Sequence, residues 1–221
     1  MVILSKIKLA RPGFAMQISG DTVDKEYIRQ KLKGRESQRN FDQGDHNLNP
    51  NMEIPKTLVP AAVLVPLVLR GDGIRVLLTQ RTDHLEHHPG QISFPGGHVD
   101  SGDKTPEDTA LRETQEEVGL SHQHIEILGR LDQYRVRTGF VVTPVVGFVT
   151  PPFEIEPDHF EVAAVFEVPL CFIMDPVNHT PQKREYRGQV RHFYGMTYDE
   201  HYIWGATAGM LINLHSILTK P

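Results

Sequence analysis

Three glutamates near the middle of the chain have the spacing of a cation-binding site. Glu113, Glu116 and Glu117 would lie within an arc of about 100° if this stretch is helical, because successive helical residues turn by about 100°. Like charges at these spacings cost a helix about 0.2–0.5 kcal/mol per pair unless a cation neutralises them. Mg²⁺ prefers carboxylate oxygens and commonly bridges them to substrate phosphates. The spacing therefore indicates a divalent-metal site, and the alternative is a solvated acidic face in which Arg112 pairs with Glu116.

The segment before the glutamates favours the metal site. Gly96 and Gly97 open a loop that runs to Asp103. Glycine allows backbone carbonyls or amides to approach a metal or a phosphate closely. Such a loop, directly before an acidic helix, is hard to explain by packing alone.

The glutamates require a helix, and the sequence marks both of its ends. Thr105 is a suitable N-cap, Pro106 a suitable first residue, and Gly119 a suitable C-terminal stop. These signals predict a helix over residues 106–118. The face opposite the glutamates carries the side chains expected to pack on the core, which are Leu111, Thr114 and Val118.

Residues 112–120 read Arg-Glu-Thr-Gln-Glu-Glu-Val-Gly-Leu, and with the preceding loop they resemble the signature of the Nudix hydrolases. Thr114 stands at an aliphatic position of that signature. Counted from Gly97, Asp103 takes the place of the first acid, and eight residues rather than seven separate it from Arg112. The part of the signature that forms the acidic helix is otherwise intact.

The resemblance implies an α/β fold, the Nudix α/β/α sandwich with a mixed β-sheet. It also implies that Glu113, Glu116 and Glu117 bind one or more Mg²⁺ or Mn²⁺ ions. The metals would polarise a diphosphate and lower the pKa of a bound water, which a carboxylate would help to aim at phosphorus.

Further roles follow from the same resemblance. The main-chain carbonyl of Gly96 or Gly97 would add a metal ligand, and Arg112 would orient the carboxylates. The general base is open between Glu113, Glu116 and an acid from a later loop. Glu161 is such an acid, although a surface position at the start of a strand explains it equally well.

A second motif lies in residues 77–97, from Leu-Leu-Thr-Gln-Arg to Phe-Pro-Gly-Gly. It resembles the coenzyme A pyrophosphatase branch of the Nudix family, which implies that Arg81, Phe94 and Gly96 bind substrate. Arg81 would attract phosphate, and the alternative is a salt bridge at the strand end. Glu86 stands where this branch usually has an arginine, which weakens attraction to a phosphate-rich ligand if the side chain faces it.

Two other groups of side chains could bind ligands. His84, His87 and His88 could bind zinc, but no thiolate accompanies them, and loop histidines are more often solvated or face phosphate. Trp204 could stack on adenine, although aromatic residues in strands more often belong to the core. Cys171 lies in an apolar run and is expected to be a small buried hydrophobe.

The remaining pattern predicts the scaffold. A helix is expected from about residue 22 to 33, and another near the C-terminus, where apolar residues recur on one face around Met210 and Leu214. An Asp-Gly turn predicts a hairpin between two apolar runs. Runs rich in β-branched and aromatic residues predict strands over residues 62–69, 74–79, 125–131, 140–149, 162–168, 193–198 and 202–204.

Composition restricts the partners. The chain has 221 residues with 23 Lys and Arg against 28 Asp and Glu, so a net charge of −5 gives no basic excess for nucleic acid. Its apolar runs are shorter than the roughly 20 residues of a membrane-spanning helix, and no clear leader is present, so a cytoplasmic location is expected. Residues 1–55 are expected to form an extension ending in a polar linker, and residues 56–221 the globular domain. The extension could support a homodimer.

The function expected from these observations is metal-dependent hydrolysis of coenzyme A or acyl-coenzyme A. The products would be adenosine 3',5'-bisphosphate and the (acyl-)4'-phosphopantetheine. One alternative is a diphosphatase for another small nucleoside diphosphate derivative, such as ADP-ribose, a dinucleotide or a nucleotide sugar. The other is a Nudix module that senses a nucleotide without hydrolysing it, for which three mutually repelling carboxylates would be unnecessary.

Overall fold

Two long strands lie side by side in parallel at the centre of the structure, a computed structural model. β4 (Val59–Arg70) pairs with β10 (Phe140–Val149) along ten consecutive positions, from Val59 opposite Phe140 to Val68 opposite Val149. The structure describes residues 16–18, 21–34, 43–53, 55–85, 88–186 and 188–220. The central pair carries the remaining strands of a mixed sheet on both sides.

The predicted hairpin is confirmed. β5 (Gly73–Arg81) runs antiparallel to the end of β4, from Leu67 opposite Val76 to Arg70 opposite Gly73, and β11 (Val162–Pro169) pairs with the other edge of β5. β8 (Ile125–Arg130) and β9 (Tyr134–Val136) pair antiparallel with β10. Two short strands pair antiparallel with the other two strands, β6 (Ile92–Ser93) with β5 and β7 (Gly96–His98) with β4.

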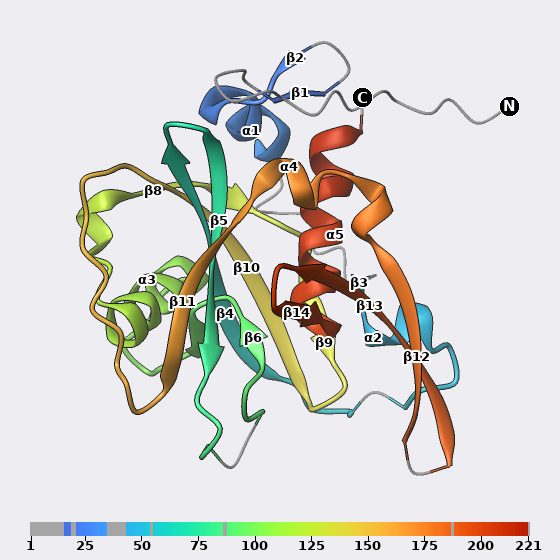
Figure 1. Ribbon diagram of the computed structural model, residues 1–221. Helices are drawn as coiled ribbons and strands as arrows, with labels where there is room; N and C mark the ends of the chain where they lie inside the picture. Colours follow the sequence, from blue (N-terminus) through green and yellow to red (C-terminus); the bar gives the residue numbers. More distant parts are fainter. Residues whose placement is uncertain are drawn as a thin grey trace, which may run out of the picture.

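Helices cover both faces of this sheet, which gives the expected α/β/α layers. Figure 1 shows α3 (Pro106–Val118) on one side and α5 (Gly205–Thr219) on the other. β4 is buried on both faces, because alternate side chains of a strand point in opposite directions. Leu64 and Val68 belong to the small clusters under α3, whereas Val65 and Leu67 belong to the main core with α5.

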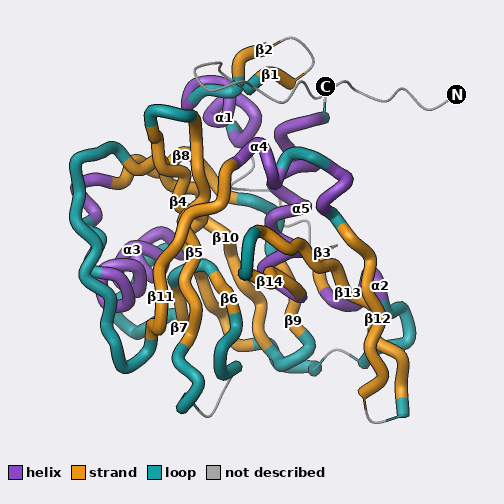
Figure 2. Tube along the Cα trace, viewed as in Figure 1, coloured by secondary structure: helices purple, strands orange, loops and turns teal. Residues whose placement is uncertain are grey.

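A second, three-stranded antiparallel sheet packs against the start of α5. It consists of β12 (Thr180–Tyr186), β13 (Gln189–Tyr198) and β14 (His201–Trp204). The β12–β13 hairpin extends away from the central sheet at the lower right of Figure 1. Figure 2 shows the same separation between the two groups of strands.

Residues 16–18 and 21–34 contribute side chains to the main core. α1 (Lys25–Leu32) begins at Asp24, whose side chain accepts a hydrogen bond from the Tyr27 amide at 2.8 Å. Ile28 and Leu32 are fully buried, and the Tyr27 hydroxyl donates to the Leu218 carbonyl at 2.6 Å. A short hairpin of β1 (Gln17–Ile18) and β2 (Asp21–Thr22) precedes this helix.

The predicted polar linker is structured where the chain is described. β3 (Gln43–Gly44) pairs in parallel with β9, and α2 (Asp45–Leu48) follows it directly. The Asp45 carboxylate accepts hydrogen bonds from the Tyr134 hydroxyl at 3.0 Å and the Arg137 amide at 3.1 Å. Polar residues can add to a sheet edge in this way, through backbone and side-chain hydrogen bonds, without entering a core.

The cysteine and the helices can also be compared with what the sequence predicts. Cys171, in α4 (Leu170–Ile173), is partly exposed rather than buried. Among the described helices, none has both the length and the apolar character needed to cross a membrane.

Candidate active site

The acidic helix begins and ends as its sequence signals predict. The Thr105 hydroxyl accepts a hydrogen bond from the Asp108 amide at 3.2 Å, and the Asp108 carboxylate accepts one from the Thr105 amide at 2.8 Å. This reciprocal pair satisfies two amides at the first turn of α3. Pro106 is the first helical residue, and Gly119 ends the helix in the left-handed conformation at φ 70°. The cap fixes where the glutamates stand relative to the loop before them.

Arg112 holds two of the three glutamates and the loop together. Its Nη1 donates to Glu113 at 2.9 Å and to Glu116 at 3.1 Å. Its Nη2 donates to Asp103 at 2.9 Å and to the carbonyl of His98 at 3.0 Å. The guanidinium therefore joins the Gly96–Asp103 loop to the helix, a planar multi-donor arrangement that lysine cannot reproduce.

Asp103 is part of this network although it stands one position away from the usual signature spacing. Its carboxylate accepts hydrogen bonds from the Arg112 guanidinium, the Asp100 amide and the Thr109 hydroxyl. These donors, led by Arg112, hold the pKa of Asp103 well below its ordinary value. Asp103 thus anchors Arg112 from the loop side.

Glu117 lies on the same helix but is buried in a different direction. It is only 7% exposed, and it accepts a hydrogen bond from the Gly96 amide at 3.2 Å. Burial raises its pKa to about 8, and the Gly96 amide and Arg81 oppose that rise. The nearest Arg81 nitrogen stands 3.8 Å from the carboxylate, beyond hydrogen-bond distance. Glu117 is therefore a buried carboxylate with incomplete charge compensation.

Arg81 ends β5 between two carboxylates. Its Nη1 lies 3.8 Å from Glu117 and 3.9 Å from Glu161, so it makes neither a close salt bridge nor a hydrogen bond with either. Glu161 directly precedes β11, and its carbonyl accepts from the Thr82 amide at 2.9 Å. The structure thus brings Glu161, whose side chain is 43% exposed, to the same site as the α3 glutamates. The sequence alone could not distinguish an active-site position of Glu161 from a surface position at the start of a strand.

The two loop glycines have different structural roles. Gly96, at φ 153°, pairs with Val63 of β4, and a Cβ there would lie 2.4 Å from the Ala62 carbonyl oxygen. Gly97 faces the helix instead, where a Cβ would lie 2.5 Å from Cδ of Glu113. Gly96 therefore allows the loop to join the sheet, and Gly97 allows it to approach a carboxylate.

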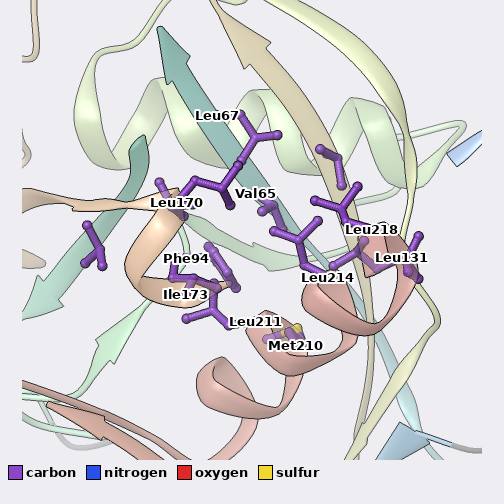
Figure 3. Packing of buried hydrophobic residues seen from close by; sticks show 14 of the residues in the cluster. Val65, Leu67, Phe94, Leu131, Leu170, Ile173, Met210, Leu211, Leu214 and Leu218 are labelled. Atoms are coloured by element: carbon purple, nitrogen blue, oxygen red, sulfur yellow. The ribbon is translucent and has the colours of Figure 1, made fainter. Parts of the chain in front are cut away.

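Phe94 was expected to contact substrate, and its position argues for a different role. It is 2% exposed and belongs to the main core. Figure 3 shows it among the buried apolar side chains near Ile173 and Leu211. The aromatic ring anchors the loop from inside, because a phenyl group gains more from burial here than from exposure beside phosphate.

The core face of α3 also differs in detail from the expected one. Thr114 and Val118 are buried, but Leu111 is only partly so. The Thr114 hydroxyl donates to the Ala110 carbonyl at 2.6 Å, which allows a polar residue at an aliphatic position of the signature. Ala110 takes the place expected for Leu111 in the packing under α3.

The donor set fits a hard divalent cation in its chemistry. Glu113, Glu116, Glu117 and the main-chain carbonyl of Gly97 offer only oxygen atoms, which Mg²⁺ and Mn²⁺ prefer. A side chain at residue 97 would fill the space beside Glu113. Within the described part of the chain, no three His, Cys, Asp or Glu side chains converge closely enough to hold a metal ion. Glu113 and Glu116 instead accept hydrogen bonds from Arg112, and Glu117 accepts one from the Gly96 amide.

The loop histidines are divided between two environments. His84 packs edge-on against Phe160 with ring centroids 4.9 Å apart, and His88 lines a separate cavity. His87 and Glu86 lie outside the described residues, so the expectations for both stay predictions.

The mixed sheet, the acidic helix and the glycine loop define an α/β protein with a carboxylate-rich candidate site at the start of a loop and along one helix. Residues 58–187 match the family model of the NUDIX domain. The chain is 42% identical over 154 residues to the uncharacterized Nudix hydrolase NudL of Enterobacter sp. (strain 638) and of Salmonella newport (strain SL254), covering 70% of this chain and 80% of each relative.

Solved structures with similarity to the chain include an Ap4A hydrolase of C. elegans, with a TM-score of 0.44 and 23% identity over 50% of this chain and 80% of that one. Another is the Nudix hydrolase RenU from M. Smegmatis, with a TM-score of 0.44 and 26% identity over 51% of this chain and 71% of that one.

The chain belongs to the Nudix hydrolase family, because the domain model and the NudL relatives each cover more than half of its length. It is therefore a diphosphatase for nucleoside diphosphate derivatives, and Nudix hydrolases generally use divalent metals such as Mg²⁺ or Mn²⁺.

Proposed function

We propose that this enzyme hydrolyses the diphosphate bond of coenzyme A or an acyl-coenzyme A. The observation that carries the proposal is the position of Arg81, which the coenzyme A motif supplies. Its guanidinium stands beside Glu117 and Glu161 without a close bond to either, so it is available to a phosphate group.

Glu113, Glu116, Glu117 and the carbonyl of Gly97 would hold Mg²⁺ or Mn²⁺. When bound, the metal supplies Lewis-acid polarisation of the diphosphate and lowers the pKa of water. The side chains of the protein itself would position the substrate, stabilise charge on its phosphates and accept the proton of the attacking water.

Two arginines have separate tasks in this proposal. Arg112 keeps Glu113 and Glu116 in position by donating to both of them and to the loop. Arg81 stabilises negative charge that develops on the phosphate oxygens during cleavage.

Glu161 is the carboxylate that accepts the proton of the attacking water in this proposal. Glu161 approaches from the start of β11, and its side chain is more exposed to solvent than that of Glu113. It can accept a proton from an attacking water, since the α3 glutamates would be occupied as metal ligands. Water adds to one phosphorus, the P–O–P bond breaks, and the products are adenosine 3',5'-bisphosphate and the (acyl-)4'-phosphopantetheine.

The test is mass analysis of the products formed with Mg²⁺ or Mn²⁺ from coenzyme A, ADP-ribose, NADH and a deoxynucleoside triphosphate in separate reactions. The proposal predicts adenosine 3',5'-bisphosphate and 4'-phosphopantetheine ahead of any other products. AMP from the other substrates, with coenzyme A intact, would assign the site to a different nucleoside diphosphate derivative. Tight nucleotide binding without any turnover would identify a sensing module.

A further inference from the structure

A cavity lies outside the candidate active site, between elements that are far apart in the sequence. Its volume is about 370 Å³, and it is bounded by the β12–β13 hairpin, the start of α5 and the segment that was expected to be a linker. The described residues that matter most here are Arg184, Arg191, Trp204, Phe193, Gln91 and Asp45.

Arginines dominate the charge of this cavity. Arg184 and Arg191 are directly opposite each other on the paired strands β12 and β13. Like charges in that position destabilise a hairpin, so an anion between them would relieve the repulsion. Within the described residues, neither forms an ion pair with a carboxylate, and Nε of Arg191 is buried without a hydrogen-bond partner.

The acidic side chain in the cavity wall is already engaged. The two carboxylate oxygens of Asp45 accept from the Tyr134 hydroxyl and the Arg137 amide. The side chain of Arg137 adds a third arginine to the lining. The lining thus holds three arginines against one aspartate, a positive balance, although the whole chain has a net charge of −5.

An aromatic surface stands beside these cations. Trp204 is 37% exposed and contacts Phe193 edge-on, with ring centroids 5.5 Å apart. It is the N-cap residue of α5, so the unpaired amides of the first helical turn, from Gly205 onward, face the same region. A planar base can stack on an exposed indole while the arginines bind phosphate.

One backbone hydrogen bond connects the cavity to the candidate active site. The Arg81 amide donates to the Gln91 carbonyl at 3.0 Å, and Gln91 and His88 line the cavity. The residue beside the reacting diphosphate and the wall of the cavity are thus directly paired across the β5–β6 loop.

We propose that this cavity binds the nucleoside end of the substrate, with Arg184 and Arg191 on a phosphate monoester that is separate from the cleaved diphosphate and Trp204 on the base. This inference rests on the proposed function, because it places the 3'-phosphate of coenzyme A at the β12–β13 hairpin. It assigns that phosphate to arginines far along the chain from the motif around Arg81 and Glu86.

Direct binding tests the cavity without requiring turnover. Trp204 is the sole tryptophan of the chain, so its fluorescence reports on this cavity. Adenosine 3',5'-bisphosphate is expected to change the emission saturably and to bind at least about tenfold more tightly than AMP, which lacks the second monoester. Equal affinity for the two ligands, or no change with either, would overturn the proposal.

Variants of the hairpin separate this cavity from general charge effects. The double substitution Arg184→Gln and Arg191→Gln should weaken adenosine 3',5'-bisphosphate at least about tenfold and leave AMP little changed. Lys183→Gln removes an exposed charge from the same strand outside the cavity lining, and it should change neither affinity. An equal loss of affinity in Lys183→Gln would mean that long-range charge attraction, and not contact with the two arginines, causes the effect, which would contradict the proposal.

Kinetics then connect the cavity to the reaction. The double variant should raise KM for coenzyme A at least about tenfold while dephospho-coenzyme A, which lacks only the 3'-phosphate, keeps its KM. Hydrolysis of neither substrate, combined with selective adenosine 3',5'-bisphosphate binding, would contradict the proposed function and leave the cavity assignment standing. Hydrolysis of both with the same KM in the wild type would contradict the cavity assignment alone.

Discussion

Gly97 lies directly against the carboxylate of Glu113. A Cβ at residue 97 would stand 2.5 Å from Cδ and 2.6 Å from each carboxylate oxygen of Glu113. Real Cβ atoms do not approach other atoms so closely, so any side chain here must displace the glutamate or the loop. The glycine is thus required by the position of the carboxylate as well as by the turn.

Gly97→Ala should therefore reduce kcat by about 10- to 100-fold, because a displacement of about 1 Å at a reacting group has effects of this size. Gly102→Ala is the matched control, since a Cβ at that exposed loop glycine meets no atom within 4 Å. Steady-state kinetics and thermal unfolding of both variants provide the measurement. Equal activity in the two would mean that the Glu113 position is not critical.

Glu117→Gln should lower kcat by about 10²–10³ and leave the fold intact, because it removes charge from the proposed metal site without removing a core contact. Thermal unfolding with and without Mn²⁺ gives a second measurement. Metal should raise the Tm of the wild type and of an exposed control, Glu185→Gln, but should raise it much less in Glu117→Gln. Full activity in Glu117→Gln would exclude this residue from the site.

Much of the active-site scaffold could be predicted from local sequence. The helix over residues 106–118 and the strand over 140–149 have the predicted bounds, because Thr105, Pro106 and Gly119 mark the first and a run rich in β-branched and aromatic residues marks the second. Local conformational preferences and period were sufficient for these elements.

Other features depend on contacts between distant parts of the chain. Asp45 pairs with Tyr134, and Arg184 faces Arg191 next to Trp204, but no local pattern indicates which of these segments meet. For the same reason, Phe94 was assigned to substrate by its motif, although its ring packs in the core.

Asn49 connects the early segment to the hairpin of the second sheet. Its side chain donates to the His192 carbonyl and accepts from the His192 amide, both at 2.9 Å. Asn49→Ala should lower the free energy of unfolding by about 1 kcal/mol and weaken adenosine 3',5'-bisphosphate binding, since the cavity wall loses both bonds. Asn51→Ala, at an exposed turn nearby, is the control, and denaturant unfolding measures the difference. Identical stability of the two variants would show that this link contributes nothing.

The start of α3 is fixed to β8 by Glu107 and Arg130. The Glu107 carboxylate accepts two hydrogen bonds from the guanidinium, each at 2.6 Å. Burial raises the pKa of Glu107, but the Arg130 guanidinium, the Glu107 amide and the Thr105 hydroxyl together outweigh burial, so the net pKa lies below its ordinary value. A carboxylate with a lowered folded-state pKa stabilises the protein above its unfolded pKa of about 4.3, and that stability is lost as the pH falls through the folded value.

Glu107→Gln should therefore cost about 1 kcal/mol of unfolding free energy at pH 7, and the difference from the wild type should shrink below about pH 4. Urea unfolding across this pH range measures it, with the exposed Glu154→Gln as control. A difference that stays constant with pH would mean that the ionised pair is not its origin.

Competition between substrates in one reaction tests the coenzyme A specificity of this enzyme most directly. Wild-type enzyme with Mg²⁺ or Mn²⁺ receives equimolar coenzyme A, ADP-ribose and NADH, and the loss of each is followed by mass, so that the ratio of rates gives the ratio of kcat/KM. We expect coenzyme A to disappear at least about tenfold faster than the others, which corresponds to about 1.4 kcal/mol of discrimination. Consumption of ADP-ribose or NADH while coenzyme A remains would contradict the assignment of this Nudix hydrolase to coenzyme A.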